Sequence, residues 1–153
     1  MRRYGRNNLM VTRVDSGITI RPLRNGETQA VQAVFDRLGP RSRLMRFGGA
    51  KPMLSERDLE QLARVDGDHH VLVALVDCAP IGIARLVRDG SSAEVAVEVV
   101  DDWQGRRVGT VLMKHLTSDA RAAGIRELHA YVVPENAASR ALLRRAAVRV
   151  SFA

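Results

Sequence analysis

Apolar positions along the chain recur with two different periods, and the change of period separates the expected helices from the expected strands. Val31, Val34 and Leu38 occupy positions i, i+3 and i+7, which predicts one face of an amphipathic helix. Ser55 precedes Asp58 by three residues, a variant of the capping box that begins another helix. The expected helices cover about 25–38, 41–47, 55–65, 108–123 and 136–145.

Short segments rich in Val, Leu and Ile, bounded by turn residues, predict the strands. The turn signals Asp77-Cys78-Ala79-Pro80 and Asp89-Gly90 separate three of them, so residues 70–100 should form an antiparallel meander. A helix then crosses from the strand that contains Glu94 to the strand that contains Leu128. The expected strands cover about 18–21, 70–76, 81–88, 92–100, 128–133 and 148–152. This order predicts an α/β domain of the α+β type, with a mixed central sheet flanked by helices.

Length and composition indicate one folded domain. Residues 1–16 show no periodicity and are expected to form a flexible N-terminal tail, whereas residues 17–153 contain no repeat or linker and suit a single domain. The chain is 46% hydrophobic and 27% charged, and only 4% of its residues are aromatic. Its core must therefore be built mainly from Val, Leu, Ile and Ala.

Several classes of protein are excluded by what the sequence lacks. Cys78 is the only cysteine, so an intramolecular disulfide is impossible, and we interpret this residue as a small apolar filler. No apolar run is long enough for a signal peptide or a bilayer-spanning helix, which predicts a cytoplasmic protein without a membrane partner. No spacing of His, Cys and Asp predicts a metal site.

The formal net charge of +7 indicates an anionic partner. Arg106 and Arg107 lie inside a glycine-containing turn, and further arginines follow Asn136 at helical spacing. Aromatic residues do not interleave with these cations and no recognition motif is present, so we expect no nucleic-acid partner. Trp103 is interpreted as a packing anchor rather than a stacking platform for a base.

The most informative segment is a strand, an acidic turn at 101–103, and a loop with Gly105 and Gly109 that opens a helix. The unpaired amides and positive dipole at a helix N-terminus bind phosphate, and glycine permits close approach of an anion to the backbone. The Walker pattern is absent because no Gly-Lys-Ser/Thr follows, and the two glycines are spaced wrongly for the dinucleotide fingerprint.

Residues 102–110, Asp-Trp-Gln-Gly-Arg-Arg-Val-Gly-Thr, resemble motif A of the GNAT superfamily of N-acyltransferases. Gln104 and Gly109 match its Gln/Arg-x-x-Gly-x-Gly/Ala pattern, whereas Arg107 stands where the pattern has its middle glycine. Residues 134–136 resemble motif B. The segment 41–47, Arg-Ser-Arg-Leu-Met-Arg-Phe, is similar to the bacterial protein-lysine acetyltransferase (Pat-like) branch. The resemblance covers about residues 18–145.

This resemblance implies acetyl-CoA as co-substrate. In the family, the backbone of the strand before motif A pairs with the pantetheine arm, the loop amides hold the pyrophosphate, and the motif B asparagine contacts the coenzyme. The implied coenzyme-binding residues are Val97, Glu98, Val99, Gln104, Gly105, Arg106, Arg107, Val108, Gly109, Thr110 and Asn136.

The family mechanism implies direct attack of a neutral amine on the thioester, assisted by a carboxylate that accepts a proton. Glu94 aligns with the base glutamate of the lysine-acetyltransferase branches and is the expected catalytic residue. Glu98 lies four residues further along the same strand, on the same side if the strand is regular, and is the second candidate. Leu143 replaces the tyrosine that many members use to protonate the leaving thiolate, and Tyr131 is interpreted as a packing residue.

We therefore expect an N-acetyltransferase that moves an acetyl group to a primary amine, on a protein lysine or a small molecule. The alternative is a non-catalytic, degenerate module that binds CoA, in accord with Leu143, Arg107 and a C-terminal end that is short for the family. The short end predicts an open sheet edge, which a homodimer or strand exchange could cover.

Overall fold

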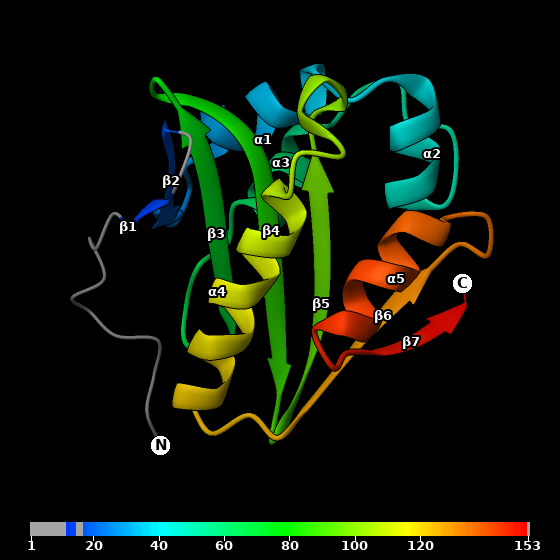
Figure 1. The fold of residues 1–153 in the computed structure, drawn as a ribbon. Helices are drawn as coiled ribbons and strands as arrows, with labels where there is room; N and C mark the ends of the chain where they lie inside the picture. The colour runs from blue at the N-terminus through cyan, green and yellow to red at the C-terminus, as the bar shows by residue number, and fades with distance from the viewer. Residues whose placement is uncertain (1–11, 15–16, 153) are drawn as a thin grey trace.

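The computed structural model describes residues 12–14 and 17–152 (Figure 1). Its strands are β1 (Thr12–Val14), β2 (Ile18–Pro22), β3 (His69–Val76), β4 (Ala79–Asp89), β5 (Ser92–Val99), β6 (Glu127–Val132) and β7 (Arg149–Phe152). Its helices are α1 (Thr28–Asp36), α2 (Pro40–Phe47), α3 (Glu56–Leu62), α4 (Val108–Ala122) and α5 (Ala137–Arg145), with a 3₁₀ turn, η2, at Asp101–Trp103. All the helices and strands expected from the sequence are present.

The described strands form one seven-stranded sheet in the order β1-β2-β3-β4-β5-β6-β7. The pairs from β1–β2 to β4–β5 are antiparallel. The pairs β5–β6 and β6–β7 are parallel. Helix α4 connects β5 to β6, because two parallel strands need a crossover rather than a tight turn. The expected meander and helical crossover are confirmed, and the direct parallel pairing of β6 with β7 is an addition.

Two local expectations need correction. Residues 12–14 form β1 and pair with β2, so this part of the expected tail is a strand, while 1–11 and 15–16 lie outside the described residues. The turn before β4 consists of Asp77 and Cys78, with φ of 49° and 67°, the positive values of a two-residue hairpin turn. Cys78 is exposed in this turn, so its interpretation as an apolar filler is wrong.

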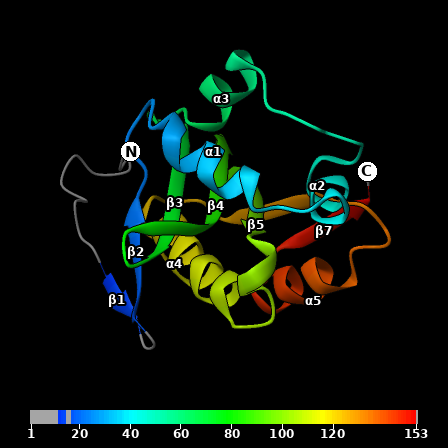
Figure 2. The same cartoon turned by 90° about the horizontal axis from the view of Figure 1, so that it is seen from above.

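Helices cover both faces of the sheet: α1 and α3 lie on one face, and α4 and α5 on the other (Figure 2). The buried side chains between these layers are mostly aliphatic, such as Val34 on α1, Val73 on β3, and Leu112 and Leu116 on α4. The predicted aliphatic core is therefore confirmed. Gly82 lets α4 approach β4 closely, because a Cβ at this position would lie 3.0 Å from Leu112 Cδ1.

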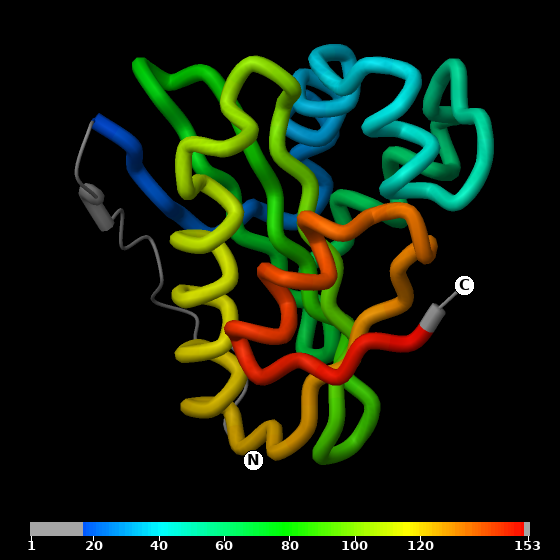
Figure 3. The backbone as a smooth tube through the Cα atoms, turned by 45° about the vertical axis from the view of Figure 1, so that its right-hand side comes forward, coloured from blue at the N-terminus to red at the C-terminus, as the bar shows by residue number. Residues whose placement is uncertain are grey.

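The sheet has two edge strands, β1 and β7. Figure 3 shows β2, the neighbour of β1, and β7 at opposite sides of the molecule. Among the described strands, none pairs with the outer edge of β7, in accord with the expected open edge. None of the helices in the described part of the chain has the length and apolar character needed to cross a membrane.

Candidate active site

Strands β5 and β6 separate soon after they begin to pair. Their register consists of Ser92↔Glu127, Ala93↔Leu128 and Glu94↔His129, and no later residue of β5 pairs with a described strand on this side. Figure 1 shows the two strands diverging upward from their common lower end. The result is a wedge-shaped opening in the sheet that is narrowest near Glu94.

The unpaired edge of β5 presents backbone hydrogen-bonding groups to this opening. The amide of Val100 donates to the carbonyl of Ile81, at 2.9 Å, and therefore faces β4. Because successive residues of a strand direct these groups to alternate edges, the N–H and C=O of Val97 and Val99 face the opening. Those of Glu98 face β4, so its backbone does not belong to the free edge that the resemblance implies for 97–99.

The loop after β5 delivers the chain to the N-terminus of α4. Gly105 has a φ of 73°, and Arg107, the residue before the helix, has a φ of 68°. Only the amide of Val111 begins the internal bonding of α4, by donating to the carbonyl of Arg107 at 3.0 Å. The preceding amides lack partners within the helix and lie at its positive end, which suits a phosphate.

Arg107 occupies the position where the GNAT pattern has its middle glycine, and the structure explains that preference. A left-handed backbone costs a non-glycine residue roughly 1–2 kcal/mol. Arg107 adopts the left-handed backbone conformation that glycine would adopt more easily. The departure from the pattern therefore raises the conformational free energy of the loop and leaves its backbone conformation left-handed at this position.

Gly109 and Asn136 bring α5 to the same end of the opening. A Cβ on Gly109 would lie 2.9 Å from Leu142 Cδ2 and 3.7 Å from Val99 Cγ2, so glycine permits the close approach of α4 to α5 and β5. The Asn136 side chain accepts a hydrogen bond from the Ser139 amide, at 3.2 Å, and caps α5.

These elements enclose a cleft of about 1150 Å³. Ten of the eleven implied coenzyme-binding residues line it, and the exception is Arg106, whose guanidinium lies 4.8 Å from the centre of the Trp103 ring. The charged residues among those that line the cleft are Arg41, Arg46, Arg107, Lys114, Arg121 and Arg145, against Glu98 and Glu135. The excess of cations favours an anionic ligand such as a nucleotide.

The two candidate carboxylates lie on the same side of β5 but in different surroundings. The register of β5 with β4 is regular from Ser92 to Val99, so Glu94 and Glu98 both face the side covered by α1 to α3. Glu94 is exposed at the narrow end of the opening, opposite His129, and is not among the residues that line the cleft. Glu98 lines the cleft and is buried.

The Glu98 carboxylate is held by two arginines that sequence reasoning did not connect with it. Arg46 on α2 donates its Nε–H to Glu98, and Nη1 of Arg85 lies 3.8 Å from the other carboxylate oxygen. Burial lowers the pKa of Arg85 to about 10, although the charge of Glu98 opposes this shift. Arg85 also donates to the carbonyl of Leu62 at 2.9 Å. No residue spacing signals these contacts, because β4, β5 and α2 meet only in the fold.

One aromatic residue, Tyr131, and one aliphatic residue, Leu143, also line the cleft. Tyr131 is 58% exposed and lines the cleft, so its interpretation as a packing residue is wrong. Its ring meets that of His129 edge to face, with centroids 5.7 Å apart. Leu143, at the position of the family tyrosine, is buried at the wall of the cleft.

Comparison with known proteins agrees with this geometry. Residues 35–147 match the Acetyltransferase (GNAT) family, so the chain belongs to that family. It is 33% identical over 141 residues to an acetyltransferase of Pseudomonas aeruginosa, a match that covers 86% of this chain and 74% of the relative. The chain is therefore a member of a family of N-acetyltransferases that use acetyl-CoA as co-substrate.

Further matches define the branch. The chain is 38% identical over 93 residues to Acetyltransferase Pat of Mycolicibacterium smegmatis. This match covers 57% of this chain but only 28% of that protein. The GNAT domain of S. lividans PAT superposes with a TM-score of 0.79 at 28% identity, over 84% of this chain and 80% of that one. These similarities confirm the GNAT fold and the Pat-like branch.

Proposed function

We propose that the chain transfers the acetyl group of acetyl-CoA to a primary amine, with Glu94 accepting the proton of the amine. The single observation that supports this most is the wedge between β5 and β6, which leads from the N-terminus of α4 to Glu94. The N-terminus of α4, which suits a phosphate, lies at one end of the open edge of β5, and the exposed carboxylate of Glu94 lies at the other. This arrangement suits a long substrate with a phosphate group at one end and a thioester at the other.

The chain supplies each part of such a site. The free amides at the start of α4 and the cationic side chain of Arg107 would hold the pyrophosphate. The outward N–H and C=O groups of Val97 and the N–H of Val99 would pair with the amides of the pantetheine arm, like an added strand. The thioester would then lie toward the narrow end of the opening, where Glu94 is exposed.

Glu94 suits proton transfer better than Glu98. A lysine amine is largely protonated at neutral pH, so it must lose a proton before it attacks the thioester carbonyl. The carboxylate of Glu98 already accepts from Arg46, and protonation would leave the half-buried Arg46 and the buried Arg85 without their counter-charge. Glu94 is exposed and reachable directly or through water.

The acceptor is a protein lysine or a small primary amine, and the amine attacks the thioester directly in a ternary complex. The C–N bond forms as the C–S bond breaks, and the thiolate of CoA leaves. Leu143 offers no proton to this thiolate, so the leaving group departs without an acid from α5. A second candidate function, a module that binds CoA without turnover, is favoured by this same residue.

The proposal is tested by calorimetric titration with acetyl-CoA and by release of free thiol with Nα-acetyl-lysine amide as acceptor. Gly109→Trp should abolish binding, because its side chain would fill the space between α4, Leu142 and Val99. Gly67→Trp is the matched control, since Gly67 has open space around its Cβ position and does not line the cleft. Binding without thiol release would favour the non-catalytic module, and equal binding by both variants would contradict the coenzyme site.

A further inference from the structure

Helix α2 borders the cleft, and its apolar contact with the core is made by its last residue, Phe47, whose ring lies 5.8 Å from that of Phe35 between centroids. Arg41, Ser42, Met45 and Arg46 of this helix line the cleft, and none of the eight residues of α2 is buried. An amphipathic helix is normally held by the burial of its apolar face, so α2, which has no buried residue, also depends on polar contacts. In the second half of the helix, Arg43 donates to the carbonyls of Pro52 and Phe35, at 3.0 and 3.1 Å, and Arg46 donates to Glu98.

The N-terminal end of α2 is capped by Asp101, which belongs to the acidic turn after β5. One carboxylate oxygen of Asp101 accepts a hydrogen bond from the amide of Gly39, at 3.0 Å. The other oxygen accepts a hydrogen bond from the hydroxyl of Ser42, at 2.6 Å. The residue before the helix, Gly39, has no side chain to serve as a cap. A Cβ on Gly39 would lie 2.5 Å from the Asp101 oxygen, so glycine is required for this contact. The carboxylate also faces the positive end of the helix dipole.

Gln104 extends this cluster into the coenzyme loop. Its side-chain amide donates to Ser42 Oγ at 3.1 Å and to the carbonyl of Val99 at 3.0 Å, and lies 3.4 Å from Asp101 Oδ1. The Val99 carbonyl is one of the groups on the free edge of β5. One cluster of four residues therefore joins α2, the loop before α4 and the strand edge along which the acyl-CoA arm would lie.

We propose that Asp101 is a positioning residue, which holds α2 in register with the coenzyme loop and so keeps Arg46 over Glu98. Both lie on the side of β5 that Glu94 faces, from which the amine acceptor would approach in the proposed reaction. This inference rests on the proposed acetyl transfer for its kinetic consequence, but not for its structural one. Asp101 touches no reacting atom in this arrangement, and it acts through Ser42 and Gln104.

The neighbouring residue offers a matched control. Asp102 is also an exposed carboxylate of η2, and its ion pair with Arg37 is long, at 3.7 Å, and 83% of its side chain is exposed. Within the described part of the chain, Asp102 makes no hydrogen bond to α2, and it does not line the cleft. Asp101→Ala and Asp102→Ala thus remove the same charge from adjacent positions, and only the first removes the cap of α2.

The test combines hydrogen–deuterium exchange of the α2 amides with steady-state kinetics on the full chain. In Asp101→Ala, exchange in α2 should become about five- to tenfold faster, the usual effect of losing a helix cap. The KM for Nα-acetyl-lysine amide should rise by a similar factor, with kcat changed less than about twofold and the Kd of acetyl-CoA less than about threefold. Asp101→Asn should restore most of both values, because its amide oxygen can still accept a hydrogen bond from the Gly39 amide, while its NH2 group can donate to the Ser42 hydroxyl oxygen.

Ser42→Ala provides a second variant, since Ser42 is not buried and its substitution does not threaten folding. Ser42→Ala should also give faster exchange in α2 and a higher KM for the acceptor, and both changes should be smaller than in Asp101→Ala. The proposal is overturned if α2 exchanges at the same rate in Asp101→Ala and Asp102→Ala, or if kcat, KM and the Kd of acetyl-CoA all worsen together with global stability. If the unmodified chain transfers no acetyl group, the proposed function fails, while the exchange measurement still decides whether Asp101 holds α2.

Discussion

The guanidinium of Arg46, near the end of α2, donates its Nε–H to the carboxylate of Glu98, which lies near the end of the part of β5 that does not pair with β6. Only 6% of the Glu98 side chain and 19% of the Arg46 side chain are exposed. Arg85 approaches the same carboxylate from β4 at 3.8 Å. A single buried anion therefore balances two cations and connects α2 to the centre of the sheet.

Removal of this anion should destabilise the fold more than removal of one cation. Glu98→Gln leaves two guanidinium groups without a counter-charge and should lower the free energy of unfolding by about 3 kcal/mol. In Arg46→Gln, Arg85 still faces Glu98, so the loss should be about 1 kcal/mol. Urea denaturation of the two variants gives the comparison. An equal loss in both would contradict the shared-anion arrangement.

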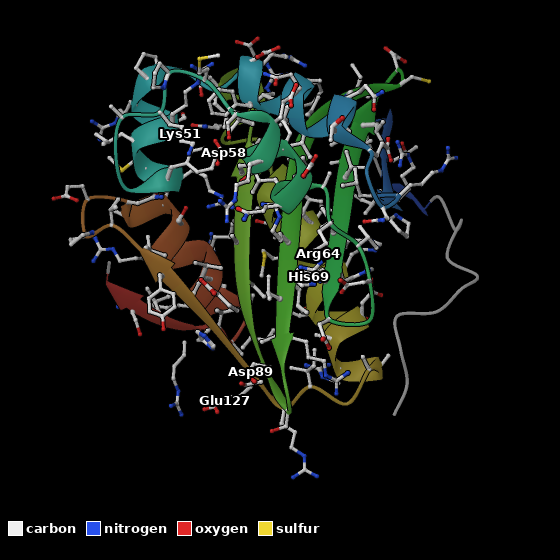
Figure 4. All side chains as sticks on the ribbon, turned by 180° about the vertical axis from the view of Figure 1, so that it is seen from behind. Lys51, Asp58, Arg64, His69, Asp89 and Glu127 are labelled. Carbon is white, nitrogen blue, oxygen red and sulfur yellow. The ribbon has the colours of Figure 1, made fainter. Side chains whose placement is uncertain are left out.

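Glu94→Gln should lower kcat by about 10²- to 10⁴-fold, because the amine would lose its proton acceptor. The Kd of acetyl-CoA should stay unchanged, since Glu94 does not line the cleft. Steady-state kinetics and calorimetry separate the two effects. Glu127→Gln is the control: this carboxylate lies at the same narrow end of the opening, where Figure 4 labels it, and its ion pair with Arg149 is exposed. A similar fall in kcat in both variants would rule out a specific role for Glu94.

Arg107→Gly should stabilise the protein by up to about 1 kcal/mol, because glycine adopts the left-handed φ of 68° without the steric cost of a side chain. The greater flexibility of glycine in the unfolded chain offsets part of this gain. Arg106→Gly should have the opposite sign, since Arg106 has no positive φ and would lose its contact with Trp103. Thermal denaturation would show whether the two changes differ in sign, and a loss of stability in both would refute the strain at Arg107.

Part of the stability should disappear in acid through Glu27, which pairs with Arg21 at 2.6 Å and connects the start of α1 to β2. The hydrogen bond from Arg21 lowers the pKa of Glu27 below its ordinary value of 4.5, although partial burial opposes the shift. A carboxyl group with a lowered folded-state pKa stabilises the fold at pH values above its unfolded pKa. This contribution is lost as the pH falls through the folded pKa.

The measurement is the urea midpoint at several pH values between about 6 and 3, for the unmodified chain and for Arg21→Gln. The variant should be less stable at pH 6, by about 0.5–1 kcal/mol, and the difference should shrink toward pH 3. A difference that stays constant over this range would mean that Glu27 does not titrate against Arg21.

The local elements of this fold could be predicted because each is encoded by neighbouring residues. The capping box of Ser55 and Asp58 forms with both of its hydrogen bonds, at 2.9 and 3.0 Å, and begins α3 where the sequence indicates. Gly124, with a φ of 82°, follows the end of α4 as a C′ glycine should. The loop with Gly105 and Gly109 likewise opens α4 at its expected place.

The arrangement of the site was decided by tertiary structure. Residue spacing in β5 puts Glu94 and Glu98 on one side of the strand, but only packing of α2 and β4 buries Glu98 against Arg46 and Arg85 and leaves Glu94 exposed. Asp101 likewise reads as part of an acidic turn until the fold brings Gly39 to it from 62 residues away. Helix and turn signals act over a few residues of chain, whereas the environment of a charge depends on segments far apart in sequence. The sequence by itself therefore determined the elements, the glycine-containing loop before α4 and the family, and the tertiary structure decided which of the two carboxylates is buried and which is exposed.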